Sequence, residues 1–237
     1  VKIRGVESHG MLCSGNELNI SDESEGIIEL KNSEKDIGKN YFKNKIEKSI
    51  DISITPNRPD ALGVYGIARD LYAKGLGKLI PRKIGEIYST FDSPVDVVLD
   101  NSVSKKDCPY FLGRYIKGIN NSSSPDWLQN RLIKIGLRPI SGLVDLTNFL
   151  TFDSARPLHA FDADRLEGDL VVRKAKNGEE LKALDGNVYK LDDTMTVIAD
   201  SKCVQAIGGI IGGENSGCSE STKNIFIESA YFDPIST

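Results

Sequence analysis

A chain of 237 residues, of which 39% are hydrophobic and 27% charged, has the composition of an ordinary globular protein, which excludes a largely disordered or fibrous one. The formal net charge of −4 excludes binding of nucleic acid through overall charge, so any contact with RNA has to come from a local basic patch. The 4 cysteines form no Cys-x-x-Cys pair and there are only 2 histidines, which excludes a Cys/His zinc cluster and favours reduced, buried thiols.

No stretch of the sequence reaches the roughly eighteen apolar residues that a membrane-spanning helix needs, and no signal-peptide pattern opens the chain. We therefore expect a cytoplasmic protein with no membrane partner. The chain begins at Val1 and ends just after a strand-like run, which is typical of a piece of a longer polypeptide.

The first part of the chain, residues 1–37, is predicted to form loops and small strands without a full core. Short apolar pieces at Met11–Cys13 and Gly26–Leu30 alternate there with Gly, Asn, Ser and acidic residues. From Ser49 to Thr55, isoleucines alternate with polar residues at the period of a half-buried strand. The sequence therefore predicts a strand over residues 49–55.

A turn and a helix are predicted to follow that strand. Prolines fix a turn over Thr55–Pro59, and apolar residues then recur at helical spacing from Ala61 to Tyr72, until Gly75 and Gly77 end the helix. Residues 77–92 are mixed in polarity and are predicted to connect this unit to a second domain.

The second domain is predicted to run from about Ser93 to Thr237 and to alternate strands with helices. One helix is expected to begin at Ser124-Pro125-Asp126, with Ser124 as its cap and Pro125 in its first turn. Leu128, Leu132 and Ile135 form its apolar face, and Gly136 ends it. A second helix is predicted at Gly142–Phe152. The predicted strands are Tyr110–Ile119, Leu170–Ala175, Glu180–Leu191, Met195–Ala199 and Asn224–Phe232. A turn at Asp185-Gly186 interrupts the third of these strands. The predicted fold class is α+β (mixed α/β) with mainly antiparallel sheet.

Three local sequences are candidates for function, and each also has a purely structural interpretation. T-P-N-R-P-D-A-L-G at Thr55–Gly63 is typical of a turn at a helix start. R-P-L-H-A-F-D at Arg156–Asp162 contains His159, which is either a packed core group or a residue that acts on a ligand. A-I-G-G-I-I-G-G-E at Ala206–Glu214 lets backbone amides approach a ligand or lets strands pack tightly. No Lys-Ser or Lys-Thr follows it, which disfavours a phosphate-binding P-loop.

These segments also match one family in order, over nearly the whole chain. The matching segments are K-I-R-G-V-E-S-H-G-M-L-C-S at Lys2–Ser14, D-I-S-I-T-P-N-R-P-D-A-L-G-V-Y-G-I-A-R-D-L at Asp51–Leu71, V-D-L-T-N-F at Val144–Phe149, P-L-H-A-F-D at Pro157–Asp162, G-G-I-I-G-G-E-N-S-G at Gly208–Gly217 and I-E-S-A-Y-F at Ile227–Phe232. Together they resemble the β subunit of bacterial phenylalanyl-tRNA synthetase. The resemblance implies the tail of an OB-type tRNA-binding domain and a linker at 1–37, a small B1-like domain at 38–92, and a C-terminally truncated B3/B4 editing domain at 93–237.

In that family the B3/B4 domain hydrolyses the ester that joins tyrosine to tRNA specific for phenylalanine. A hydrophobic pocket rejects an added hydroxyl by only about a hundredfold, so a second site that binds the hydroxyl is needed. The resemblance assigns recognition of that hydroxyl to Glu228, with His159 close by. Whether His159 acts as a base or only positions the ligand stays open.

The resemblance also implies further site residues. Thr147 and Asn148 match residues that hold the ligand or the attacking water, and Arg138 matches an arginine beside the pocket. Gly209 and Gly212 match residues that line it, where their amides would leave room for the ester or stabilise an oxyanion. Since the sequence offers no Ser-His-Asp arrangement, direct attack by water is expected, helped by a hydroxyl of the terminal ribose.

Two departures from the family pattern bear on the site. Ala155-Arg156 stands where the family commonly has Gly-Gln, which is expected to alter the pocket rim. The family's editing domain continues beyond the position of Thr237, so further pocket residues are expected there. The resemblance implies tRNA(Phe) and an α subunit as partners in an (αβ)₂ heterotetramer. It implies no cofactor or metal for this piece, because the α subunit holds the site for ATP and Mg²⁺.

Two other functions stay open from the sequence. The chain is alternatively a scaffold or RNA-contact module without hydrolytic activity, whose basic residues would meet RNA phosphates. Those residues surround the first helix of the second domain: Arg114, Lys117, Arg131, Lys134 and Arg138. A weaker interpretation is a stand-alone binder of a small molecule at the glycine-rich segment.

Overall fold

The computed structural model describes residues 2–18, 24–29, 37–39, 49–103 and 106–237, which form two units, Val1–Lys48 and Ser49–Thr237. In the first unit, β1 (Lys2–Ile3) pairs antiparallel with β2 (Val6–Glu7). Small strands are therefore present, as predicted, but they lie outside the predicted apolar pieces, and Met11–Cys13 carries no strand. Leu30, the last residue of the predicted apolar piece at Gly26–Leu30, lies outside the described residues. Residues 40–48, near the start of the predicted 38–92 domain, also lie outside them.

The predicted strand over residues 49–55 is wrong. These residues carry no strand in the structure, and Ile50 and Ile52 are exposed. Alternation of apolar and polar residues predicts a strand only where a second strand offers hydrogen bonds, and no described residue pairs with this segment.

The turn and helix that follow are confirmed. A 3₁₀ turn, η2 (Pro59–Ala61), leads into α1 (Val64–Ala73), and Gly75 ends the helix with a φ of 78°. Arg58 ties the turn to the helix, because its guanidinium bonds the carboxylates of Asp60 and Asp70.

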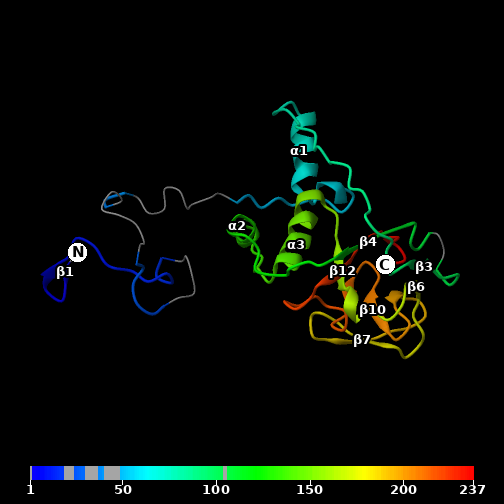
Figure 1. The fold of residues 1–237 in the computed structure, drawn as a ribbon. Helices are drawn as coiled ribbons and strands as arrows, with labels where there is room; N and C mark the ends of the chain where they lie inside the picture. Colours follow the sequence, from blue (N-terminus) through cyan, green and yellow to red (C-terminus); the bar gives the residue numbers. More distant parts are fainter. Residues whose placement is uncertain (1, 19–23, 30–36, 40–48, 104–105) are drawn as a thin grey trace. The chain divides into compact units, whose positions relative to one another are not determined.

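Helix α1 packs against the end of α3 (Gly142–Ser154), which places the turn beside the second predicted domain (Figure 1). Gly63 makes the close approach possible, since a Cβ on it would lie 2.4 Å from the backbone nitrogen of Ala155. The segment 49–73 therefore belongs to the same compact unit as the rest of the chain to Thr237.

The strands of this unit form two larger sheets and a hairpin. A five-stranded sheet has the order β11-β10-β9-β6-β3, a three-stranded sheet has the order β4-β12-β5, and β7 pairs with β8. The bounds are β3 Val97–Leu99, β4 Tyr110–Lys117, β5 His159–Asp162, β6 Leu170–Lys174, β7 Glu180–Lys182, β8 Val188–Lys190, β9 Thr196–Ala199, β10 Val204–Ile207, β11 Ile211–Gly212 and β12 Asn224–Tyr231. Among them only β3 and β6 pair in parallel, so the predicted α+β class with mainly antiparallel sheet is confirmed.

The two sheets share one apolar core. Phe161 and Phe226, which lie opposite each other on β5 and β12, pack with Leu170, Val172 and Ile198 of the larger sheet. All five side chains are buried. Burial of each large apolar side chain contributes roughly 1.5–3 kcal/mol, so this cluster fixes the three-stranded sheet on the larger one.

Helix α2 (Asp126–Lys134) begins differently from the prediction. Pro125 occupies the cap position, and Ser124 does not cap the helix, because its hydroxyl instead donates to the buried carboxylate of Asp145 on α3. That carboxylate also accepts from the backbone N–H of Ile140 at 2.8 Å. A buried carboxylate needs several donors, and this need outweighs the cap.

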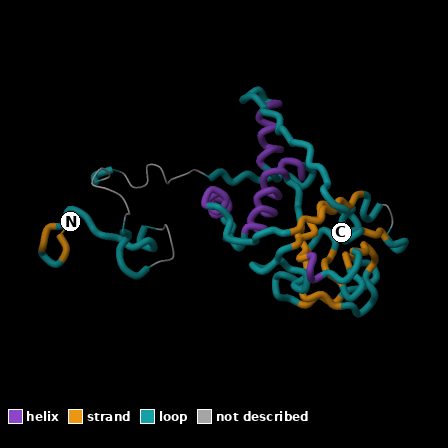
Figure 2. Tube along the Cα trace, in the orientation of Figure 1, coloured by secondary structure: helices purple, strands orange, loops and turns teal. Residues whose placement is uncertain are grey.

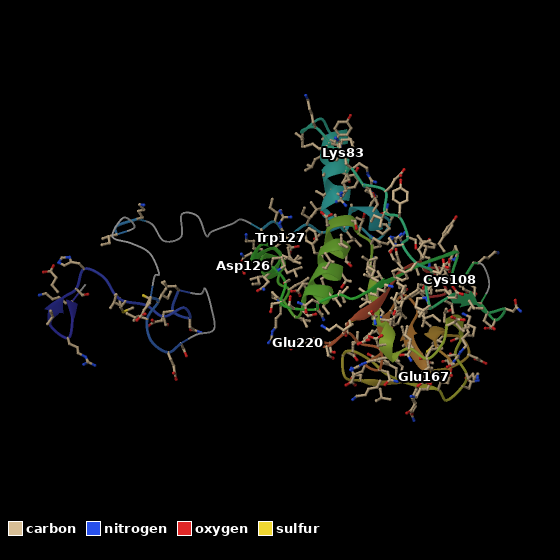
Figure 3. The ribbon with its side chains drawn as sticks, in the orientation of Figure 1. Lys83, Cys108, Asp126, Trp127, Glu167 and Glu220 are labelled. Carbon is tan, nitrogen blue, oxygen red and sulfur yellow. The ribbon has the colours of Figure 1, made fainter. Side chains whose placement is uncertain are left out.

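The apolar face of α2 is shorter than predicted. Leu128 and Leu132 are buried, whereas Ile135 is the exposed C-cap residue. Trp127, labelled in Figure 3, packs edge to face on Phe149 of α3, and the ring centroids are 5.6 Å apart. Figure 2 shows the result within this unit, in which the α-helices α1, α2 and α3 gather apart from the strands.

Candidate functional site

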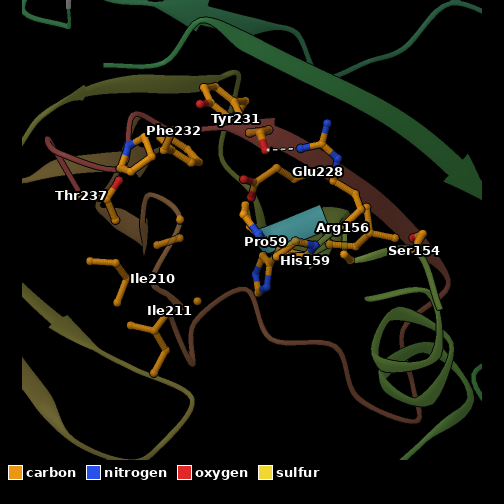
Figure 4. Close-up of a pocket in the computed structure, with 18 of the residues that line it drawn as sticks. Pro59, Ser154, Arg156, His159, Ile210, Ile211, Glu228, Tyr231, Phe232 and Thr237 are labelled. Carbon is orange, nitrogen blue, oxygen red and sulfur yellow. Dashed lines mark hydrogen bonds between the residues drawn. The ribbon is translucent and has the colours of Figure 1, made fainter. Parts of the chain in front are cut away.

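A pocket of about 610 Å³ opens where β12, β5, the loop after β10 and the start of α1 meet (Figure 4). Glu228 and His159 line it from the three-stranded sheet, and Ile210 and Ile211 lie across from them. Pocket walls therefore come from segments that lie far apart in the sequence, and the shared core of the two sheets holds them in place.

Glu228 is a buried acid that faces this pocket. Glu228 is 8% exposed, and no described residue donates a hydrogen bond to its carboxylate. Burial raises the pKa of Glu228 from 4.5 to about 7, because the charged form loses its hydration. An unpaired buried carboxyl is costly, so its presence here indicates a group kept for a ligand.

His159 lies directly opposite Glu228 in the antiparallel pairing of β5 with β12. Its ring packs edge to face on Phe161, with centroids 4.4 Å apart, and its Nε2 is buried without a hydrogen-bond partner among the described residues. Burial lowers the pKa of His159 to about 4, so the imidazole is neutral near pH 7.

The glycine-rich segment makes room for side chains of the pocket. A Cβ on Gly212 would lie 2.2 Å from Cε1 of His159, and a Cβ on Gly209 would lie 3.0 Å from Cδ2 of Phe232. Gly209 also has a φ of 72°, which other residues rarely adopt. The segment forms the tight β10–β11 hairpin, as the structural interpretation of its glycines predicts, and it also lines the pocket. An approach of its amides to a ligand stays a prediction.

The structure brings together four of the seven predicted site residues. Glu228, His159, Gly209 and Gly212 line the pocket. The other three, which are Arg138, Thr147 and Asn148, are absent from the described residues that line it.

Each of those three residues lies elsewhere in the helical part. Thr147 and Asn148 are half-buried on α3, where the Thr147 hydroxyl donates to the carbonyl of Val144 at 2.9 Å. Arg138 is exposed between α2 and α3. Their roles at the site stay predictions.

One wall of the pocket was missed from the sequence. Asp60, Tyr65 and Arg69 line it from η2 and α1, and Arg69 forms an ion pair with Asp60. The signal was the T-P-N-R-P-D-A-L-G motif at Thr55–Gly63, a candidate for function to which the sequence assigned no role in the pocket. Arg156 adds a cation at the rim, where its Nη1 donates to the carbonyl of Ala230 at 3.4 Å (Figure 4).

No cysteine is among the described residues that line the pocket, and two cysteines outside this lining carry thiols that are not activated. Burial, followed by the nearby charge of Glu228, raises the pKa of Cys108 to about 11, and burial raises that of Cys218 to about 11. Both thiols therefore stay protonated near pH 7. Within the described ranges, no three His, Cys, Asp or Glu side chains are arranged to hold a metal ion, and no helix is long and apolar enough to cross a membrane.

A family model described as the B3/4 domain matches residues 107–237, which are more than half of the chain. The chain belongs to the B3/4 domain family. Its B3/4 region contains Glu228, His159 and the whole glycine-rich segment, whereas the wall from η2 and α1 precedes it.

Curated relatives of this B3/4 protein extend the likeness to nearly all of its residues. The phenylalanine–tRNA ligase beta subunit of Ruegeria pomeroyi is 50% identical over 98% of this chain and 30% of the relative. The protein of the same description from Mesorhizobium japonicum is 51% identical over 100% of this chain and 29% of the relative. The resemblance predicted from the sequence is thus confirmed, and the chain spans about 30% of the length of these relatives.

A solved structure is distantly similar to this B3/4 chain. It is an N-terminal fragment of the phenylalanyl-tRNA synthetase beta-subunit from Pyrococcus horikoshii, 20% identical, with a TM-score of 0.46. The match covers 76% of this chain and 55% of that one. A likeness at this level adds nothing to the family assignment, which the family model already carries.

Proposed function

We propose that this chain is the editing part of a phenylalanyl-tRNA synthetase β subunit and hydrolyses tyrosyl-tRNA(Phe). The observation that carries the proposal is the Glu228 carboxyl, which is buried, faces the pocket and has no hydrogen-bond partner among the described residues. The curated relatives, which are phenylalanine–tRNA ligase beta subunits, supply phenylalanine and tRNA, whereas tyrosine rests on the family resemblance alone.

Selectivity for tyrosine follows from the chemistry of the Glu228 carboxyl. A phenol donates a hydrogen bond to this group, whereas a phenyl ring leaves it buried and unpaired. An unmade hydrogen bond of a buried group costs about 1–3 kcal/mol, and more for a charged group. A site of this kind inverts the preference of a hydrophobic pocket that tolerates an added hydroxyl.

Hydrolysis requires only a positioned water. Water adds to the ester carbonyl, the tetrahedral intermediate collapses, and the ribose oxygen leaves with a proton. Neutral His159 suits the positioning of ligand or water, because a buried imidazole with an unpaired Nε2 still exchanges hydrogen bonds with either. We assign Thr147 and Asn148 to the same task, and Arg138 to the substrate, on the family pattern alone.

The rest of the assembly belongs to the same proposal. We propose an α subunit as partner in an (αβ)₂ heterotetramer and tRNA(Phe) as ligand. ATP and Mg²⁺ are assigned to the α subunit, and the enzyme is placed in the cytoplasm. The division into a tRNA-binding tail and linker at 1–37, a B1-like domain at 38–92 and an editing domain at 93–237 is proposed with it.

The rival scaffold or RNA-contact function has less support. Two of its candidate cations are engaged within the chain, since Lys117 Nζ lies 4.1 Å from the centre of the Phe91 ring and the Arg131 guanidinium lies over Trp127. A cation over an aromatic ring keeps its charge, but the ring already holds it in place within the chain.

A release assay tests the editing proposal. The chain is incubated separately with tyrosyl-tRNA(Phe) and phenylalanyl-tRNA(Phe), and free amino acid is measured over time. We expect faster release of tyrosine, and we expect Glu228→Ala to remove the difference. Glu220→Gln, at an exposed acid outside the pocket lining, is the matched control and should behave as the unaltered chain (Figure 3).

A longer chain serves as a second control in that assay, extended beyond Thr237 along the sequence of the relatives. Selective release by the longer chain alone would show that residues beyond Thr237 complete the site. Equal, background release of both amino acids by both chains would contradict the editing proposal and favour the scaffold.

A further inference from the structure

A second hollow lies beside the pocket, on the other face of the three-stranded sheet. This groove, of about 440 Å³, is lined by Tyr110, Leu112, Arg156, Ser229 and Tyr231. Arg156 and Tyr231 also line the pocket that holds Glu228. The groove and the pocket are therefore continuous at these two residues.

The groove has an aromatic floor. Tyr110 and Tyr231 lie directly opposite each other in the β4–β12 pairing, as do Leu112 and Ser229. Because side chains alternate along a strand, Ser229 points away from the face that carries Glu228. Tyr110 is 72% exposed, Leu112 69% and Tyr231 45%. Two neighbouring phenol rings are thus open to a ligand.

Arg156 supplies the charge of the groove. Strand β5 begins at His159, so its pairing with β12 ends at Glu228, and beyond that point Arg156 lies beside β12, where it donates to Ala230. Its bond to the carbonyl of Ala230, at 3.4 Å, is long and leaves further guanidinium donors for a ligand. Arg114, two positions after Leu112, is exposed on the same face of β4 and adds a second positive charge on this face. Among the described residues, no acid lines the groove.

We propose that this groove binds an unpaired nucleotide at the 3′ end of the RNA substrate. A base stacks on Tyr110 and Tyr231, and the Arg156 guanidinium binds the adjoining phosphate. The aminoacyl ester then passes between Arg156 and Tyr231 into the pocket. The identity of the RNA rests on the proposed function, while the base and phosphate chemistry rests on the groove itself.

The composition of the groove favours this ligand over a protein segment. A protein segment on an exposed sheet face is expected to bury mainly aliphatic side chains, whereas this lining has one, Leu112, beside two phenols, a hydroxyl and the Arg156 guanidinium, and no acid lines it among the described residues. Stacking with a nearby arginine is how single-stranded nucleic acid is commonly held, because every base has a π face and a phosphate.

The test uses a tetraribonucleotide, ACCA, labelled with fluorescein at its 5′ end, and measures its binding to the chain by anisotropy. We expect Tyr110→Ala and Tyr231→Ala each to weaken binding about tenfold. Arg156→Gln should weaken it as well and lower the slope of log affinity against log salt by about 0.7, the share of one phosphate.

Matched controls are Tyr88→Ala and Arg165→Gln, which should bind as the unaltered chain. Tyr88 is a tyrosine outside the groove that is about as exposed as Tyr110, and Arg165 also donates to a backbone carbonyl at 3.4 Å. Thermal melting of each variant separates a folding defect from a lost contact. A substitution that lowers the melting temperature is repeated as Tyr→Phe, which keeps the stacking ring and should restore binding.

The proposal is overturned if the unaltered chain does not bind ACCA, or if the groove variants bind it as tightly as the controls do. If the groove variants bind ACCA as tightly as the controls do, the same variants are made in a chain extended beyond Thr237. A melting temperature below that of the unaltered extended chain would identify the segment after Thr237 as the occupant of the groove. Failure here is distinguishable from failure of the editing function, because oligonucleotide binding requires no hydrolysis and hydrolysis is measured separately.

Discussion

Glu228 on β12 and His159 on β5 lie directly opposite each other, and burial moves their pKa values in opposite directions, to about 7 and about 4. In the protein the carboxyl therefore holds its proton at higher pH than it would in water, while the imidazole loses its proton at lower pH. Two neighbouring groups whose pKa values cross in this way are typical of a functional site.

The raised pKa of Glu228 makes stability fall as pH rises. The folded form binds a proton up to about pH 7 and the unfolded form only up to about 4.5, so the stabilising contribution is complete below 4.5 and is lost through pH 7. Glu228→Gln should therefore gain stability relative to the unaltered chain between pH 4.5 and 7, by up to about 3 kcal/mol. Urea unfolding at several pH values measures this, and parallel curves for the two chains would refute it.

His159 should give the opposite pH dependence. The unfolded imidazole binds a proton below about pH 6.5 and the folded one only below about 4, so stability is lost as pH falls between these values. His159→Gln should remove that loss. The same urea titration checks it, and a variant that still loses stability over this range would show that another group is responsible.

Gly212→Ala tests the contact that seats the imidazole. The added methyl would lie 2.2 Å from Cε1 of His159, so the ring has to move, at a cost of about 1–3 kcal/mol. Because the imidazole is displaced, the selective release of tyrosine should also fall. Gly85→Ala is the control, because a Cβ there meets no atom within 4 Å. Equal stability of the two variants would mean that the ring is not confined.

Ala155→Gly should stabilise the chain. Ala155 caps α3 with a φ of 53°, a conformation that disfavours any residue with a Cβ by roughly 1–2 kcal/mol. We expect a gain of about 0.5–1 kcal/mol, after the greater freedom of glycine in the unfolded chain is deducted. Ala68→Gly, within α1, should instead lose about 1 kcal/mol. Thermal melting measures the change in stability of both variants. A lower melting temperature for Ala155→Gly than for the unaltered chain would contradict the cap geometry.

Asp145→Ala should separate α2 from α3. The substitution leaves the hydroxyl of Ser124 and the N–H of Ile140 without their acceptor, which costs about 1–3 kcal/mol or more. Asp126→Ala, at the exposed first turn of α2, should cost only about 0.5 kcal/mol. Helix content by circular dichroism and unfolding midpoints measure the difference, and equal costs would show that the Asp145 network adds nothing.

Helices and turns that are determined by residues close together in the sequence were predicted well. Helix α1, helix α3 and the turn at Asp185-Gly186 follow from spacing and turn residues, and Gly186 has the expected positive φ of 84°. The failures depend on distant partners. The segment 49–55 lacks a strand to pair with, and the cap at Ser124 is lost to Asp145, 21 residues away.

The site was predicted only as far as family resemblance reaches. Glu228 and His159 were expected near each other, but the pairing that sets them face to face depends on the register of β5 with β12, which no local pattern reveals. The wall from α1 was missed for the same reason, because it depends on the close approach of Gly63 to Ala155.

The most direct test of the editing account is the ratio of two rate constants, for release of tyrosine and of phenylalanine from the same tRNA, in the unaltered chain and in Glu228→Ala. The account predicts a ratio well above one that falls by about tenfold or more when the carboxyl is removed. A ratio that Glu228→Ala leaves unchanged, in a variant that still folds, would contradict it.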